Sequence, residues 1–465
     1  MPPSRPSFVR SSVVGLALLG ALAPAAAHAQ VAPAAPAEPA PADAPVAPTE
    51  PAPPVAPVAA PAPAPPAEPA PPAPHVGYKD GFFLENADAT VRLKIGGYLQ
   101  ADSRHCLGDD DEKLVDQFVL RRARLDLDAT FYDRFEVRLL PDFAGSKLVL
   151  FDAWIDLKLH PAFHIRVGKQ KPQVGLERLQ SATALHFVER GLPSDLVPNR
   201  DVGVQLWGDA AGGVISWAAG VFDGVPDGGN GDGDTSDDKE LNARLFFSPF
   251  AARKDSPLQN LGVGGVVTYG DKHGSFAAPD VAPFKTSGQA SFFTPVVGTD
   301  AGTTVLAKGT HVRAGGQGYA YVGPVGVLAE VYHSAADVLY GAEEGTLRAT
   351  AWQVAAIVEL TGEKASFKGA APAHPFDGKG GVGGFELAAR VGGLQIADSA
   401  FVKGFADPTR SARSALAIGG GVRWNAVRGV RVYVDLEHTS FDGGGTAGTD
   451  RPAEDVLLTR VQTVF

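Results

Sequence analysis

The sequence predicts an all-β protein: a transmembrane antiparallel β-barrel of about 16 strands with one loop folded inward. Three observations support this fold class. Apolar and polar residues alternate with a period of two over residues 117–170, the alternating segments are about ten residues long, and an export signal opens the chain. Phe151 and Ile155, for example, share one side, whereas Asp152 and Trp154 share the other. A soluble β-sandwich also alternates, but its strands are usually only about five or six residues long.

The export signal occupies residues 1–29. Arg5 and Arg10 precede an apolar run from Val13 to Leu22, and the small-residue sequence Ala27-His28-Ala29 ends the segment. This arrangement is typical of a cleaved secretory signal, and the apolar run is too short for a transmembrane helix. We therefore expect the chain to be exported and then cut near the end of this segment.

Residues 30–74 consist almost entirely of Pro, Ala and Val with scattered acidic residues. Such a composition gives an extended, polyproline-like chain without a hydrophobic core. We interpret the segment as a disordered periplasmic spacer that can contact the cell wall, and a passive tail is an equally good interpretation. The barrel is then expected over residues 75–465.

Sixteen segments have the pattern of strands, and the count is even, as in bacterial single-chain barrels. They are residues 91–102, 117–131, 134–143, 150–160, 162–171, 202–208, 213–222, 238–249, 260–270, 309–322, 325–336, 349–361, 384–397, 412–425, 428–441 and 455–465. No run after the spacer approaches ~18 apolar residues, so a membrane crossing has to be made by a closed barrel. The chain ends on Phe465, and a terminal aromatic residue on an amphipathic strand is typical of outer-membrane barrels.

Two connections are much longer than turns, residues 172–201 and residues 271–308. Long loops in a compact fold are usually functional or disordered. The first of them mixes Leu, Phe and Val with Arg and Glu. We expect it to fold into the lumen and to narrow it.

The polar faces of the strands carry many arginines that the alternation directs to the lumen. They are Arg122, Arg124, Arg138, Arg166, Arg244, Arg313, Arg390, Arg413, Arg423, Arg431 and Arg460. A ring of guanidinium groups favours anions over cations and suits phosphate oxygens. Asp126, Asp128 and Glu136 share these faces, so the charges can instead form internal ion pairs that hold the lumen open. The formal net charge of −11 argues against a polyanionic partner such as nucleic acid.

The sequence does not predict an enzyme, a cofactor or a metal site. It contains no G-x-S-x-G motif, and His160, His164 and His186 lack a convincing serine partner. The lone Cys106 has no partner for a disulfide, and with His105 it supplies only two candidate metal ligands.

A set of longer motifs runs through the chain from about residue 81 to residue 465. They are LRRARLDLDATFYDRFEVRLLPDF, FDAWIDLKL, VGKQKPQVGLERLQSATALHFVERGL, NRDVGVQL, LTGEKASFKGAAPAHPFD, FELAARV and VYVDLEHTSFDGG followed by DRPAEDVLLTRVQTVF. Together and in this order they resemble the phosphate-selective porin O and P family. The resemblance implies a sixteen-stranded outer-membrane barrel, usually a homotrimer, that passes phosphate or other small anions along a path lined by arginine and lysine.

The resemblance also implies which residues meet the anion. The paired arginines of the family match Arg121 and Arg122, and the acidic residue of its constriction matches Asp142. The lysine ahead of its inward loop matches Lys171, with Lys169 nearby.

The alternation directs Arg122, Arg124 and Arg138 to the lumen but Arg121 to the lipid. A β-bulge at Arg121 would turn both members of the pair inward, because an extra residue changes the direction of a side chain. Without a bulge, Arg121 would lie at the membrane edge and extend its head group to water.

We therefore predict passive diffusion of phosphate or similar small anions through a barrel in the bacterial outer membrane. The chain departs from the family pattern after Lys171, where Val174 and Gly175 stand in place of hydroxylated side chains that would help to bind the anion. Two alternatives remain: a weakly selective general porin and, in a different class, a barrel-anchored cell-wall tether.

Overall fold

The computed structural model describes residues 74–79, 81–108, 114–233 and 236–465. The predicted export signal, and all of the predicted spacer except Pro74, lie outside these residues.

The described residues form strands and a few short helices. The strands are β1 (His75–Tyr78), β2 (Phe82–Glu85), β3 (Val91–Cys106), β4 (Gln117–Phe131), β5 (Phe135–Asp142), β6 (Val149–His160), β7 (Phe163–Gln170), β8 (Asp201–Ala210), β9 (Ile215–Phe222), β10 (Glu240–Phe247), β11 (Asn260–His273), β12 (Phe284–Lys285), β13 (Ser291–Phe293), β14 (Leu306–Val322), β15 (Val325–Tyr340), β16 (Glu343–Glu359), β17 (Gly384–Ile396), β18 (Ala412–Val427), β19 (Val430–Gly443) and β20 (Glu454–Val464). The helical segments are α1 (Leu176–Leu179), α2 (Ser399–Val402), η1 (Leu192–Leu196), η2 (Ala211–Gly213), η3 (Ala301–Thr303) and η4 (Thr446–Gly448). None of the described helices is both long and apolar enough to cross a membrane.

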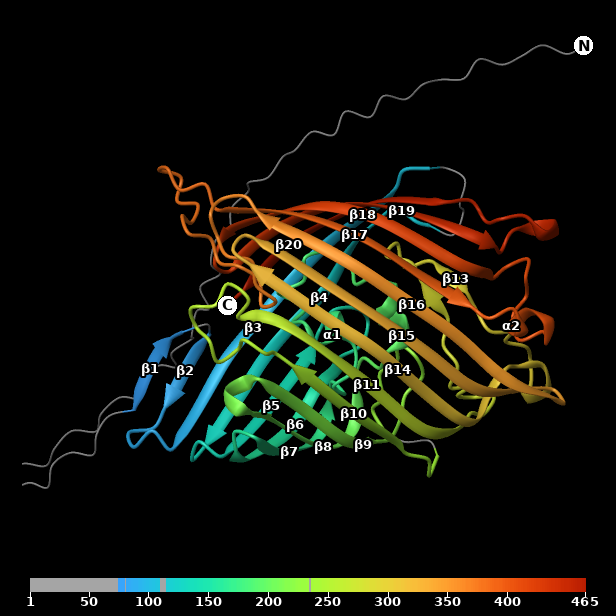
Figure 1. The fold of residues 1–465 in the computed structure, drawn as a ribbon, viewed down its shortest axis with the longest axis horizontal. Helices are drawn as coiled ribbons and strands as arrows, with labels where there is room; N and C mark the ends of the chain where they lie inside the picture. The colour runs from blue at the N-terminus through green and yellow to red at the C-terminus, as the bar shows by residue number, and fades with distance from the viewer. Residues whose placement is uncertain (1–73, 80, 109–113, 234–235) are drawn as a thin grey trace, which may run out of the picture. The chain divides into compact units, whose positions relative to one another are not determined.

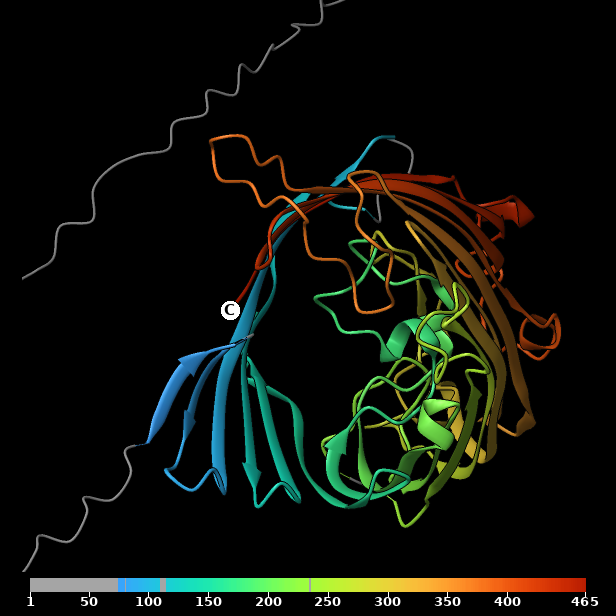
Figure 2. The same ribbon diagram turned by 60° about the vertical axis from the view of Figure 1, so that its left-hand side comes forward.

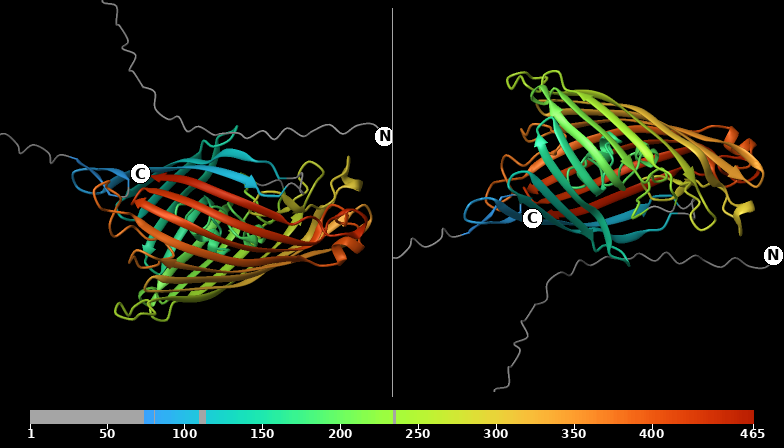
Figure 3. Two further views of the ribbon diagram at one scale, coloured as in Figure 1. Left: turned by 90° about the horizontal axis from the view of Figure 1, so that it is seen from above. Right: turned by 90° about the horizontal axis from the view of Figure 1, so that it is seen from below.

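Eighteen strands belong to one sheet, and sixteen of them close into an antiparallel barrel (Figure 1). From β3 to β20, leaving out β12 and β13, each strand pairs with the next along the chain, and β20 pairs with β3 from Val464 opposite Tyr98 to Val456 opposite Cys106. The strands are tilted and continuous on both sides of the molecule (Figure 3). Closure leaves no open sheet edge among the sixteen strands, which a lipid environment requires. All sixteen predicted strands are confirmed.

The outer surface of the barrel is apolar. Large apolar side chains are exposed on it all around the sheet, among them Leu139, Ile155, Leu245, Val263, Val331 and Leu436. Alternate residues of the same strands point inward, and the largest fully buried side chains include arginines. Apolar side chains on the outside and charged side chains on the inside are the reverse of the arrangement in a soluble protein, and they are typical of a barrel surrounded by lipid.

β15 and β16 extend further than predicted and meet in a two-residue turn, Gly341-Ala342. In this extension Val338 and Leu347 are buried in an apolar cluster inside the barrel, while Arg348 is exposed. The apolar side is therefore the inner side here, the reverse of the lipid-facing region. The extension was not predicted because its apolar residues do not continue the lipid-facing alternation of the two strands.

The short β1–β2 hairpin was not predicted. β2 pairs with the first part of β3, from Phe82 opposite Ile95 to Glu85 opposite Arg92, on the edge whose later part pairs with β20. Strands of four residues carry too little alternation to be distinguished from the preceding linker. The hairpin covers the part of the β3 edge that β20 does not reach.

Gly168 in β7 provides a test of the barrel packing. Its φ is +121°, and a Cβ atom there would lie 2.2 Å from the carbonyl oxygen of Ala153 on β6. We expect Gly168→Ala to lower the free energy of unfolding by roughly 2–4 kcal/mol, from overpacking and backbone strain together. Urea unfolding in lipid vesicles, followed by tryptophan fluorescence, measures this change.

Gly265 in β11 is the matched control, because its Cβ would meet its nearest atom, the carbonyl oxygen of Gly315, at 3.5 Å. Gly265→Ala should leave the unfolding midpoint almost unchanged. Equal midpoints for the two variants would show that the close approach at Gly168 does not constrain the barrel.

Candidate functional site

The connection between β7 and β8, residues 171–200, lies inside the barrel and contains α1 and η1 (Figure 2). We call it the inner loop. Its apolar side chains are buried against the inner wall: Val174, Leu176, Phe187, Val188, Leu192, Leu196 and Val197. Burial of these side chains holds the loop in the lumen rather than in solvent. The prediction that this connection folds inward is confirmed.

Arginines of β17 and β18, here called the far wall, donate hydrogen bonds to the backbone of the inner loop. Arg390 on β17 donates to the carbonyl oxygen of Glu189 (3.0 Å), and Arg423 on β18 donates to that of Leu185 (3.1 Å). Backbone carbonyls that cross a lumen need such donors, because a buried unpaired carbonyl costs free energy. These arginines therefore anchor the loop.

Four deeply buried lumen arginines also form ion pairs. Arg313, Arg390, Arg423 and Arg460 are at most 5% exposed, and each has a carboxylate partner. In one such pair, Arg460 lies 2.7 Å from Asp102. A carboxylate partner offsets the cost of burying a guanidinium group. These four side chains do not contribute to the predicted arginine ring around the pore. Their charges are offset by carboxylates, and Arg390 and Arg423 also bind the inner loop.

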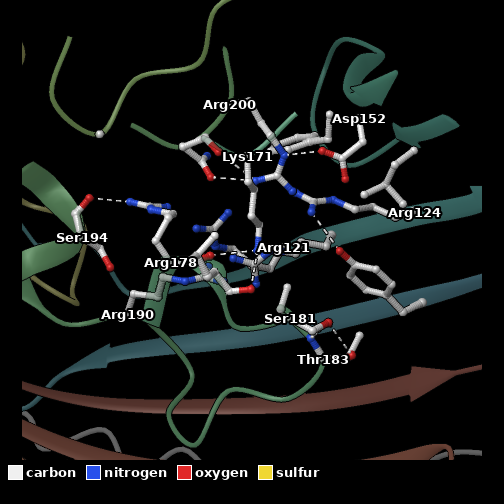
Figure 4. A pocket seen from close by; sticks show the side chains of 18 of the residues that line it. Arg121, Arg124, Asp152, Lys171, Arg178, Ser181, Thr183, Arg190, Ser194 and Arg200 are labelled. Atoms are coloured by element: carbon white, nitrogen blue, oxygen red, sulfur yellow. Dashed lines mark hydrogen bonds and ion pairs between the residues drawn. The ribbon is translucent and has the colours of Figure 1, made fainter. Parts of the chain in front are cut away.

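A cavity of about 720 Å³, here called the chamber, lies between the inner loop and the wall made by β3–β7. Six acidic and eleven basic side chains line it, and the basic ones are Lys94, Arg121, Arg122, Arg124, Arg138, Arg166, Lys171, Arg178, Arg190, Arg200 and Lys285. The chamber is therefore positively charged, although the chain as a whole has a net charge of −11. Figure 4 shows six of these cations together, Arg121 and Arg124 from the wall and Lys171, Arg178, Arg190 and Arg200 from the inner loop.

Arg121 and Arg122 both reach the lumen because of a β-bulge. Gln100 on β3 pairs with Arg122, and the next residue, Ala101, pairs with Leu120, so Arg121 is an extra residue in β4. Arg121 lines the chamber and forms an ion pair with Glu189 of the inner loop at 2.6 Å. Of the two orientations considered for Arg121, the structure has the one that a bulge produces.

Arg122, Arg124 and Arg138 also line the chamber, as the alternation predicted. Arg124 is paired with Asp142 at 2.7 Å, and Arg138 with Asp126 at 2.5 Å. Asp142 thus holds an arginine in place and is not among the residues that line the chamber.

Arg122 differs from its neighbours, because its guanidinium donates to the side-chain oxygen of Gln100 (2.6 Å). Within the described residues it forms no ion pair.

The two predicted lysines have different environments. Lys169 pairs with Asp232 and is not among the residues that line the chamber. Lys171 does line the chamber, and its ammonium group donates to the carbonyl oxygens of Arg178 (2.8 Å) and Gln180 (3.1 Å) at the end of α1. No carboxylate of the described chain lies within ion-pair distance of Lys171.

Two cations of the inner loop, Arg178 and Arg190, were not predicted, because an irregular loop has no period from which side-chain direction can be inferred. Both line the chamber without a carboxylate partner among the described residues. Burial lowers the pKa of Lys171, Arg178 and Arg190, and nearby cations lower it further: Arg200 acts on Lys171 and Arg178 acts on Arg190. A bound anion would relieve this repulsion.

A closed antiparallel barrel with an apolar outer surface, an inner loop and a charged chamber is the structure of an outer-membrane porin. Residues 93–465 match the sequence model of the family described as phosphate-selective porin O and P, and the chain therefore belongs to this family.

Solved structures share the fold at low sequence identity. The outer membrane channel DcaP of Acinetobacter baumannii has a TM-score of 0.53 and 12% identity, over 83% of this chain and 99% of that chain. OmpT, an outer membrane protein of Vibrio cholerae, has a TM-score of 0.50 and 12% identity, over 81% and 98%. OprB of Pseudomonas putida has a TM-score of 0.50 and 11% identity, over 81% and 95%. No curated protein sequence matched the chain.

Asp195 of the inner loop provides a pH test of the chamber. Its carboxylate accepts a hydrogen bond from the backbone N–H of Lys285 (2.7 Å), and burial raises the pKa of this carboxyl to about 7. The group is neutral below that pH and negative above it, where it offsets the charge of Arg178. We expect the permeability of chloride relative to potassium to fall about threefold to tenfold as the pH rises from about 5.5 to about 8.5. Reversal potentials in planar bilayers measure this ratio.

Asp195→Asn removes this titrating group and should make the fall of the ratio over this range smaller than in the wild type. A wild-type ratio that does not change with pH, or an Asn variant that keeps the full change, would contradict the assignment.

Proposed function

We propose that the barrel provides passive, anion-selective diffusion of phosphate or similar small anions through the chamber. The observation that carries the proposal is a set of chamber cations that form no ion pair within the described chain: Lys94, Arg122, Lys171, Arg178, Arg190 and Lys285. Family membership supports the class of solute. It also supports our expectation that three copies assemble in the outer membrane.

Paired and unpaired cations have different effects on a passing ion. Arg124 and Arg200 are each 2.7 Å or less from a carboxylate, so their charge is largely offset. They mainly stabilise the wall and the contact of the inner loop with it. An unpaired cation leaves a positive potential in the chamber, which attracts anions and repels cations. Arginine stays protonated at neutral pH, so this selectivity does not require a titration.

Hydroxyl groups complete the lining. Ser181, Thr183 and Ser194 line the chamber, and the hydroxyls of Ser181 and Thr183 lie 2.9 Å apart. They supply neutral hydrogen-bond donors to the chamber. The family pattern predicts such donors at the positions of Val174 and Gly175, which have no hydroxyl group. Donors distributed over the chamber favour weak capture at several points, and conduction needs release as well as binding.

Arg178→Gln tests the proposal. A unit charge about 6 Å from a passing ion changes its energy by roughly 0.7 kcal/mol at the dielectric constant of water, with opposite sign for anion and cation. Loss of the charge should therefore lower the permeability of chloride relative to potassium about tenfold. The reversal potential of the purified barrel under a salt gradient measures this ratio.

Arg253→Gln, on an exposed turn between β10 and β11, is the control for a change of net charge alone. It should leave the ratio unchanged. An equal ratio for wild type and Arg178→Gln, or cation preference in the wild type, would leave only a weakly selective general porin.

A further inference from the structure

The chamber has a second kind of wall, which faces the inner loop and is aromatic. Tyr98 on β3 and Phe151 and Trp154 on β6 contribute rings to the lining, with Leu140 of β5 beside them. Anion attraction alone does not require these rings, because the cations of the inner loop supply it. The rings therefore need a separate explanation.

A β-bulge turns Phe151 into the lumen. Leu140 pairs with Asp152 and the next residue, Pro141, pairs with Leu150, so Phe151 is an extra residue in β6. The alternation predicted an outward, lipid-facing position for it, and the structure corrects this. Bulges of this kind are common next to functional sites, where they change the direction of a side chain.

Two guanidinium groups lie on these rings. The central carbon of Arg124 is 3.6 Å above the ring of Phe151, and that of Arg166 is 4.1 Å above the ring of Trp154. Arg124 is also 2.7 Å from Asp142, so a carboxylate offsets much of its charge. Fixed in this way, the guanidinium planes and the rings present flat surfaces on which another planar π-system can stack.

The size of the chamber agrees with a solute larger than an inorganic oxyanion. Its volume of about 720 Å³ falls in the range of roughly 300–1,000 Å³ typical of sites for organic ligands. The chamber thus offers cations on the inner loop for an acidic group, and flat rings on the opposite wall for an organic body.

We propose that the chamber selects organic anions in which an acidic group is joined to a planar ring, such as aryl phosphates and aryl carboxylates. This inference rests on the proposed anion passage and names the class of solute for the same chamber. The acidic group is held by Lys171, Arg178 and Arg190, and the ring stacks on the surface that Arg124 and Arg166 form with Phe151 and Trp154. Inorganic phosphate uses only the first of these contacts.

The test compares phenyl phosphate with methyl phosphate, a monoester that has the same acidic group and no ring. Each is added to chloride-conducting barrels in a planar bilayer, and the concentration that halves the chloride current is measured. We expect phenyl phosphate to block wild type at a concentration about threefold to tenfold lower than methyl phosphate, as one aromatic stack would give.

Trp154→Leu and Phe151→Leu, made separately, keep an apolar side chain but remove the ring. Each should bring the two blocking concentrations closer together and leave the value for methyl phosphate unchanged. Trp352→Leu is the control, because Trp352 lies on β16, is 40% exposed and does not line the chamber. It should keep the full difference. Reversal potentials recorded on each variant confirm that the barrel and its cations are intact.

Equal block of wild type by the two monoesters, in a barrel that prefers chloride over potassium, would overturn this inference and leave the proposed anion passage standing. A preference for phenyl phosphate that persists in both ring variants would also overturn it. A wild-type barrel without anion preference that neither monoester blocks would overturn both proposals.

Discussion

The structure depends on one requirement, that the backbone of a loop buried against the inside of the barrel wall finds hydrogen-bond donors. The far wall meets it with Arg390 and Arg423, which donate to loop carbonyls while carboxylates balance their charge. Neither group would be stable in this position alone, because a buried charge and a buried carbonyl both need partners. With the loop held to that side, the remaining space lies against β3–β7, and this space is the chamber.

The sequence determines the strands well for a physical reason. Lipid contact requires an apolar residue at every second position, so all sixteen barrel strands were predictable. The prediction fails where that requirement ends. At Val338 and Leu347 the apolar side faces inward, and the four-residue strands β1 and β2 are too short to carry a pattern.

The chamber was predictable only in part. Arg122 and Arg124 follow from alternation, whereas Arg121 and Phe151 reach the lumen through bulges that shift the register by one residue. Alternation also cannot show which inward arginine has a carboxylate beside it. That difference, which separates Arg122 from Arg460, arises from pairing between strands far apart in sequence.

The two ends of the inner loop leave the wall side by side, since Gln170 at the end of β7 pairs with Asp201 at the start of β8. The inner loop therefore connects β7 and β8 as a hairpin loop would, whatever its length. The pairing of the two strands does not depend on the residues of the loop. Loop closure costs little more as a loop lengthens. The strand ladder can therefore stay the same while the inner loop changes, so one barrel can be adapted to new solutes by changing this loop together with the few wall side chains that contact it.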